Sequence, residues 1–133
     1  MRELTAMRVA AVLCALMGLP QVALAQFTVP VAPPVADGAT LFTRQCGTCH
    51  LITEDGGPRQ GPNLHFVFGR KAGTVPGFAY SAGYTESGIV WNEASLDRYL
   101  TNPQAVIPGS IMAYRQTDPE IRQTIIAWLR EQR

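Results

Sequence analysis

Residues 46–50 read Cys-Gly-Thr-Cys-His, so two thiols and one imidazole lie within five positions. Side chains of these types bind soft metal ions, form disulfides or anchor a haem. Three kinds of site are therefore open at this stretch: a structural zinc site, a switchable disulfide and a covalent haem attachment site.

The zinc and disulfide interpretations both meet difficulties. A structural zinc site needs four ligands in a closed tetrahedron, and Cys46, Cys49, His50 and His65 could supply them. Cys49 and His50 are adjacent in the sequence, however, and adjacent side chains rarely converge on one small ion. A redox-active disulfide of the thioredoxin type needs a strand before the motif, whereas a helical pattern precedes this one.

Haem attachment fits the motif best, because C-x-x-C-H is the sequence signature of c-type haem attachment. Cysteines three positions apart on a helical turn lie on one side of the backbone, so Cys46 and Cys49 can each bond one vinyl group of the haem. His50 then points its ring at the iron as the first axial ligand. The sequence therefore predicts one covalently bound haem c per chain.

The opposite axial ligand is predicted to be Met112, in the segment Pro-Gly-Ser-Ile-Met-Ala-Tyr. A His/Met pair is a known haem ligation that raises the reduction potential. Met112 could instead fill a gap in the core. Its position in a Pro-Gly loop, and its being the only methionine after residue 25, favour the ligand role. His65 is the rival ligand, but we expect it at the surface.

The first 25 residues have the pattern of a secretory signal peptide. Arg2 and Arg8 belong to a basic start, an apolar run follows from Val9 to Leu19, and residues 23–25 are suited to cleavage. That run is short for a membrane span, which needs about 20 residues. We therefore expect cleavage and a periplasmic location; retention of the segment as a membrane anchor is the alternative.

The remaining chain divides into a proline-rich flexible leader, residues 26–36, and a single domain, residues 37–133. Cleavage leaves nine basic and nine acidic residues, so no strongly basic face for nucleic acid is expected. The carboxylates are scattered, without a pattern of catalytic acids and bases. This predicts a protein that is not an enzyme.

Three helices are predicted, and no convincing strand pair, so the fold class is all-α. The first covers residues 38–45 behind the N-cap Asp37, and the second covers 92–100 behind Asn92, limited by Pro103. The third lies within 118–133, where Asp118 caps and Pro119 occupies the first turn. Residues 51–90 should be mostly loop. A loop of that length needs something to pack on, and a large prosthetic group would supply it.

The chain from about residue 38 to 130 resembles the class I c-type cytochromes, of the mitochondrial cytochrome c and bacterial cytochrome c2 type. The resemblance rests on motifs in the family's order: CGTCH, GPNLHFVFGRKAG, PGFAYS, GIVW, YLTNP and IPGSIMAY. It implies the cytochrome c fold, with long loops wrapped around one haem. It also implies a one-electron carrier whose iron is held by His50 and Met112.

The resemblance also implies roles for further residues. The carbonyl of Pro62 would accept the Nδ1–H of His50 and orient the imidazole. Tyr99 would lie beside the methionine sulfur. The residues that would form hydrogen bonds around the haem propionates are Arg70, Tyr80, Trp91 and Ser110. The contact between the first and last helices would involve Gly38, Phe42, Ile125 and Trp128.

The chain departs from the family pattern at two places that bear on function. Tyr84 stands where many relatives carry a small polar residue near the haem. Vertebrate relatives ring the exposed haem edge with lysines, and four of those positions are taken here by Gln45, Gln104, Ala105 and Ile111, which leaves Arg59 and Arg115. Docking to partners should therefore depend little on salt.

The expected partners are redox proteins, above all membrane-bound oxidoreductase complexes, and the carrier is expected to be a monomer. Two alternatives stay open. One is a membrane-tethered cytochrome that keeps its N-terminal anchor. The other is a haem peroxidase or gas sensor, in which Met112 would leave the iron readily.

Overall fold

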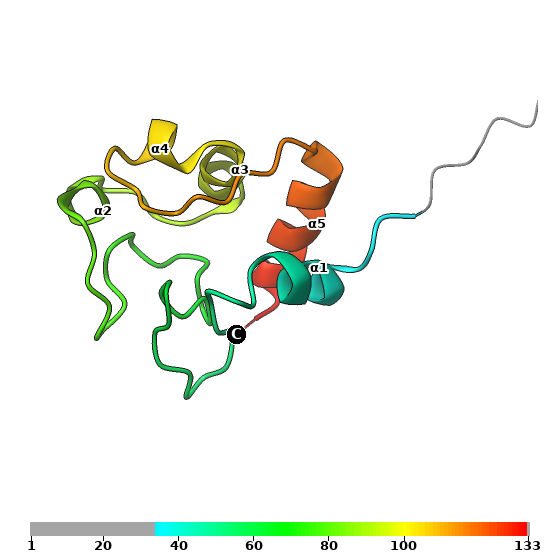
Figure 1. Cartoon of the computed structure of the whole chain (residues 1–133), viewed down its shortest axis with the longest axis horizontal. Helices are drawn as coiled ribbons and strands as arrows, with labels where there is room; N and C mark the ends of the chain where they lie inside the picture. Colours follow the sequence, from blue (N-terminus) through cyan, green and yellow to red (C-terminus); the bar gives the residue numbers. More distant parts are fainter. Residues whose placement is uncertain (1–33, 133) are drawn as a thin grey trace, which may run out of the picture. The chain divides into compact units, whose positions relative to one another are not determined.

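The computed structural model describes residues 34–132, and in that part the chain forms five helices and no strand. Their order is α1 (Gly38–Gln45), α2 (Ala82–Glu86), α3 (Glu93–Thr101), α4 (Pro103–Val106) and α5 (Pro119–Arg130). Figure 1 shows α1 and α5 side by side, with α3 and α4 forming a second group. The all-α fold class and its three main helices, α1, α3 and α5, are thus confirmed. The predicted signal peptide lies outside the described residues, as does most of the predicted leader.

Each main helix begins at the cap that its sequence predicts. The carboxylate of Asp37 accepts a hydrogen bond from the N–H of Thr40 at the start of α1. Asn92 and Ser95 form a reciprocal capping box at the start of α3. Asp118 accepts bonds from the first turn of α5, where a proline is tolerated because its missing N–H would have no partner.

The contact between α1 and α5 depends on one small residue. A Cβ at Gly38 would overlap the side chain of Trp128, so only glycine lets the two helices approach this closely. Phe42 packs on the same indole, with ring centroids 4.9 Å apart. An ion pair between Arg122 of α5 and Asp97 of α3, at 2.9 Å, connects α3 to α5.

The two short helices were not predicted. Helix α2 falls in the segment expected to be loop, and its N-cap Ser81 makes no capping hydrogen bond through its side chain. Helix α4 begins at Pro103, which was expected only to limit the preceding helix. Asn102 ends α3 and its side chain also caps α4, so one residue separates the two helices.

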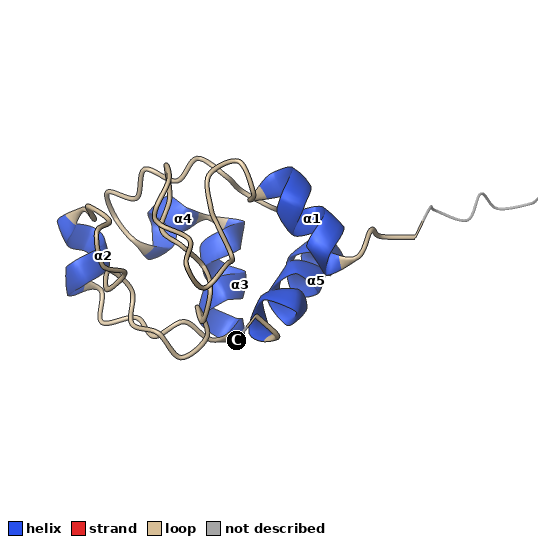
Figure 2. Cartoon of the chain, turned by 90° about the horizontal axis from the view of Figure 1, so that it is seen from below, coloured by secondary structure: helices blue, strands red, loops and turns tan. Residues whose placement is uncertain are grey.

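The core combines helical residues with residues from the long connections. Figure 2 shows how much of the described chain is loop, and Val67, Ala72 and Ile107 in those loops are as buried as the helical core residues. The loops are held by backbone hydrogen bonds between segments that are distant in the sequence, for example from Gly69 N–H to the Trp91 carbonyl at 2.8 Å. None of the helices in residues 34–132 is long and apolar enough to cross a membrane.

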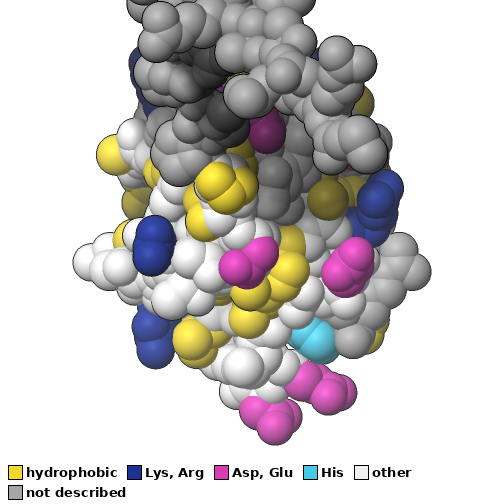
Figure 3. Space-filling view, turned by 90° about the vertical axis from the view of Figure 1, so that its right-hand side faces the viewer, with side chains coloured by type: hydrophobic (Ala, Val, Ile, Leu, Met, Phe, Trp, Pro, Cys, Tyr) yellow, Lys and Arg dark blue, Asp and Glu magenta, His cyan; other side chains and the backbone are white. Residues whose placement is uncertain are grey.

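Charged side chains are dispersed over the described part of the face that Figure 3 shows. On the face shown in Figure 3, lysine and arginine side chains stand singly among acidic, apolar and uncharged ones. The visible, described part of this face therefore carries no basic patch of the kind that binds nucleic acid.

Candidate functional site

A cavity of about 590 Å³ lies between the helices and the long loops, within the range of roughly 300–1,000 Å³ typical of cofactor sites. Its lining comes from the end of α1, the loops before α2 and after α4, and the inner faces of α3 and α5. Nine of the ten residues predicted for the site line this cavity: Cys46, Cys49, His50, Pro62, Arg70, Tyr80, Trp91, Tyr99 and Met112.

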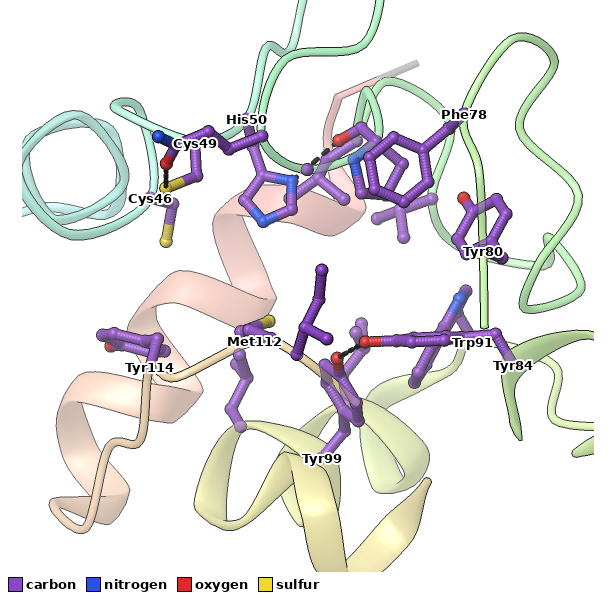
Figure 4. Close-up of a pocket in the computed structure, with 18 of the residues that line it drawn as sticks. Cys46, Cys49, His50, Phe78, Tyr80, Tyr84, Trp91, Tyr99, Met112 and Tyr114 are labelled. Atoms are coloured by element: carbon purple, nitrogen blue, oxygen red, sulfur yellow. Dashed lines mark hydrogen bonds between the residues drawn. The ribbon is translucent and has the colours of Figure 1, made fainter. Parts of the chain in front are cut away.

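The two cysteines stand at one side of the cavity, where α1 ends (Figure 4). The N–H groups of Cys49 and His50 both bond the carbonyl of Cys46, at 3.0 and 2.9 Å, so a helical turn carries the motif. Both thiols are free, and Cys49 donates to the Gln60 side chain at 3.1 Å. Burial raises the pKa of Cys46 to about 11, with a smaller contribution from Cys49, so its thiol is protonated at neutral pH.

His50 presents a free nitrogen to the cavity. Its Nδ1 lies 2.7 Å from the carbonyl oxygen of Pro62, and a carbonyl can only accept, so Nδ1 carries the proton. Burial lowers the pKa of His50, and the bond to Pro62 opposes that shift only in part. The imidazole is therefore neutral at pH 7, with the Nε2 lone pair available to a metal. Gly61 lies so close that a Cβ there would overlap the ring.

Met112 lies across the cavity from His50, as Figure 4 shows. Its loop is held from outside by Gln104 of α4, whose amide donates to the carbonyls of Met112 at 2.7 Å and Ser110 at 3.3 Å. Arg115 in turn donates to the side-chain oxygen Oε1 of Gln104 at 3.0 Å. These hydrogen bonds to the loop backbone do not involve the thioether, which stays available to a ligand.

Polar groups gather at the side opposite the cysteines, where Tyr80, Tyr84 and Trp91 stand in Figure 4. Arg70, which also lines the cavity, donates to two backbone carbonyls of its own loop, at 2.7 and 2.8 Å. The hydroxyl of Ser81, another lining residue, is buried without a hydrogen-bond partner. A half-buried cation and an unpartnered buried hydroxyl suit an anionic group entering the cavity.

Two of the residues considered at the sequence level do not line the cavity. Ser110 stands behind its wall, where its hydroxyl bonds those of Tyr84 and Tyr99. His65 is half-buried outside it, with its ring 4.3 Å from that of Phe66. Within residues 34–132, no three His, Cys, Asp or Glu side chains are placed to hold a metal ion together, which removes the support for a zinc site.

The arrangement suits a haem. The cavity is largely apolar, with two thiols at one edge, anion-binding groups at the other, and a nitrogen and a sulfur on facing walls. Sequence reasoning missed the roles of Ser81, Gly61 and the Gln104 amide, because each depends on how the loops fold around the cavity and none follows from a residue pattern. The only local indication was the position of Ser81 directly after Tyr80 in the motif PGFAYS.

Comparison with known proteins agrees with this geometry. The Cytochrome c family model matches residues 35–133. The chain is 41% identical over 103 residues to cytochrome c of Sesamum indicum, covering 75% of this chain and 93% of that protein. It is 41% identical over 101 residues to cytochrome c of Chlamydomonas reinhardtii, covering 75% and 90% respectively. The chain therefore belongs to the cytochrome c family, whose members carry electrons on a covalently bound haem and are not enzymes.

Proposed function

We propose that this chain is a monohaem electron carrier of the periplasm, with His50 and Met112 as the axial ligands and Cys46 and Cys49 as the thioether anchors. The observation that supports this most directly is a cavity that has His50 and Met112 on facing walls and both thiols at one edge. The haem supplies a one-electron Fe(II)/Fe(III) couple when it is bound.

The residues of the chain favour electron transfer over substrate chemistry. The Pro62 carbonyl fixes the tautomer of His50, so that Nε2 is the nitrogen offered to the iron. The Met112 thioether is a soft ligand that favours the ferrous state. With His50 and Met112 both bound to it, the haem iron would have no open position for a substrate or for O₂.

The polar end of the cavity would hold the haem propionates. Arg70, Tyr80 and Trp91 line this region, and the unpartnered hydroxyl of Ser81 would gain an acceptor there. Ser110 would act behind the wall, through its bonds to the tyrosines. Donors at these positions offset the cost of burying anionic groups, which is several kcal/mol when no partner is present.

The family implies redox proteins as partners, and we propose membrane-bound oxidoreductase complexes as donor and acceptor. The signal-like pattern of residues 1–25 supports export, with the carrier acting as a monomer outside the cytoplasmic membrane. N-terminal sequencing of the mature protein tests the export step, and a chain that begins at Gln26 is the expected result. A chain that retains residues 1–25 would support the membrane-tethered form instead.

The ligand set is tested by the visible spectrum of the ferric protein. We expect a sulfur-to-iron charge-transfer band in the red, because a thioether bound to ferric iron gives rise to one. The substitution Met112→Ala should abolish this band, while His65→Ala, outside the cavity, should leave it unchanged. A wild-type protein that lacks the band at neutral pH would contradict Met112 ligation and favour a peroxidase or sensor.

A further inference from the structure

Three hydroxyl groups from different segments meet at the wall of the cavity. Tyr84 comes from α2, Tyr99 from α3, and Ser110 from the loop that leads to Met112. The Tyr84 oxygen lies 2.5 Å from that of Tyr99 and 2.7 Å from that of Ser110, and the third side of the triangle measures 3.2 Å. Figure 4 shows Tyr84 and Tyr99 joined in this way beside Met112.

The triangle is complete in hydrogen-bonding terms. Each hydroxyl has one proton and can accept as well as donate, so three hydroxyls can form three bonds in a ring. Tyr99 and Ser110 are both 6% exposed, and an unpaired hydroxyl at such a depth would be costly. Tyr84 makes the two short bonds, and it is therefore the member that joins the other two.

Helix α2 is packed directly against the loop that Ser110 belongs to. A Cβ at Gly83 would overlap the carbonyl of Pro108, so the backbones touch at this point. Only glycine allows such an approach, and it places the neighbouring Tyr84 ring within reach of Ser110. Movement of the loop away from α2 would separate Ser110 from Tyr84 and break the bond between them.

The two residues that flank Ser110 give the loop little support by apolar packing. Gly109 adopts a left-handed conformation with φ of 81°, and Ile111 is 82% exposed, so neither anchors the loop by apolar packing. Gln104 holds the backbone of the loop through the carbonyls of Ser110 and Met112. The Ser110 hydroxyl is the inner attachment, two residues before the sulfur.

We propose that Tyr84 is a positioning residue that keeps the Met112 loop closed over the cavity, through its bonds to Ser110 and Tyr99. This inference rests on the proposed role of Met112 as an axial ligand. Without the Tyr84 hydroxyl only the longest contact of the triangle remains, so the state in which Met112 has left the iron becomes more populated. Tyr84 is one of the positions at which this chain departs from the family pattern.

Imidazole provides the test, because it binds the ferric iron of the intact haem protein only where Met112 has left it. Its apparent affinity therefore reports the population of the open state. One hydrogen bond contributes enough to change that population by about two- to tenfold. The substitution Tyr84→Phe should tighten imidazole binding by this factor, and Ser110→Ala should do the same.

The matched control is Thr85→Val, which removes an exposed hydroxyl from the same short helix but outside the triangle. It should leave imidazole affinity at the wild-type value. The single substitutions Tyr84→Phe and Ser110→Ala act through the same bond, so their effects should not be additive. The double variant Tyr84→Phe/Ser110→Ala should therefore gain less imidazole affinity than the sum of the two single changes in binding free energy.

The outcomes separate the two proposals. If wild-type protein lacks the sulfur-to-iron band, Met112 is not the ligand, and the role of Tyr84 fails with it. If the band is present and Tyr84→Phe binds imidazole as wild type does, only the positioning role is refuted. The positioning role would be refuted even if urea unfolding of Tyr84→Phe showed a loss of stability, since a purely structural tyrosine would also produce that loss.

Discussion

Gly61 leaves no room for a side chain beside the imidazole of His50. A Cβ at this position would overlap the ring, and the next residue, Pro62, supplies the carbonyl that orients the imidazole. Gly61 and Pro62 thus set where the imidazole can lie and which of its nitrogens carries the proton. The position of the His50 ring is therefore determined by the loop residues Gly61 and Pro62 as well as by the CGTCH motif.

The substitution Gly61→Ala should displace His50 and weaken its approach to the iron. We expect a loss of about 1–3 kcal/mol in the free energy of unfolding, as for other overpacked sites. Urea unfolding and the Soret spectrum of the haem protein measure both effects. The control is Gly57→Ala, where a Cβ would meet nothing within 4 Å, and its values should match the wild type. Equal behaviour of the two variants would contradict the steric argument.

Tyr99 should make stability decline at alkaline pH. Burial raises the pKa of Tyr99 above its usual range, so the folded state keeps the proton that the unfolded state releases near pH 10. Its stabilising contribution is complete below about pH 10 and is lost as the pH rises, by up to about 1.4 kcal/mol per pH unit. The variant Tyr99→Phe should therefore show a shallower decline.

Urea unfolding of the ferrous protein between about pH 9 and about pH 11 measures this slope. Tyr80→Phe provides the comparison: burial also raises the pKa of Tyr80, but the ring is partly exposed and solvent weakens the effect. The two variants should differ, with Tyr99→Phe giving the larger change. Identical slopes in wild type and Tyr99→Phe would show that Tyr99 ionises equally in both states.

The helices differ in how far the sequence alone could predict them. The caps Asp37, Asn92 and Asp118 are local features, and all three mark the starts of their helices as predicted. Helix α4 also has a local cap, Asn102, followed by Pro103 at its first position, but a cap alone does not predict a helix of four or five residues, because the stability of such a helix comes from packing. Helix α2 is held by the hydroxyls of Tyr99 and Ser110, which lie 15 and 26 residues from Tyr84 in the sequence.

For helix α5, the sequence pattern predicts only part of the buried surface. The helical spacing of Ile121, Ile125, Trp128 and Leu129 predicts one buried face, whereas the structure also buries Ile126, at 1% exposure. The cause is that α5 contacts both α1 and α3, so its apolar surface is wider than one stripe. Which second partner a helix meets depends on tertiary arrangement, and periodicity cannot reveal it.

The close contact of α1 and α5 should respond strongly to one methyl group. The substitution Gly38→Ala would place a Cβ against Trp128, and we expect a loss of about 1–3 kcal/mol in the free energy of unfolding. Urea unfolding of the haem protein measures it. Ala39→Ser, exposed on the same helix, should change stability by less than about 0.5 kcal/mol. A tolerated Gly38→Ala would mean that the helices can separate at little cost.

The molecule as a whole carries little charge to steer a partner. The formal net charge of the full chain is +1, and the residue beside Met112, Ile111, is apolar and 82% exposed. Long-range attraction to a charged partner is therefore weak, and short-range contact should decide docking.

Oxidation of the ferrous protein by ferricyanide can measure this property. Between about 0.01 M and about 0.15 M ionic strength, the rate constant for wild type should change by less than about twofold. The double variant Ala105→Lys/Ile111→Lys adds two cations at exposed positions near Met112, and its rate should fall clearly with salt. A steep salt dependence of the wild type would contradict weak steering.

The cavity also sets a limit on the stability of the chain without its haem. At roughly 24 cal/mol per Å³, an unfilled cavity of about 590 Å³ would cost about 14 kcal/mol, as much as the whole stability of a typical domain. The double variant Cys46→Ser/Cys49→Ser, purified without haem, should therefore lack the helical far-UV circular dichroism of the haem protein. A cooperative thermal transition in this variant would contradict the expected need for haem.

The same cavity implies an order of events in the life of the molecule. A chain whose core is completed by a cofactor reaches its compact state only after the cofactor has been attached. Until then its long connections are open to proteases, and its apolar residues are accessible to chaperones. We therefore expect chains without haem to be degraded first, so that the chains that persist long enough to meet a partner are those that carry the redox group.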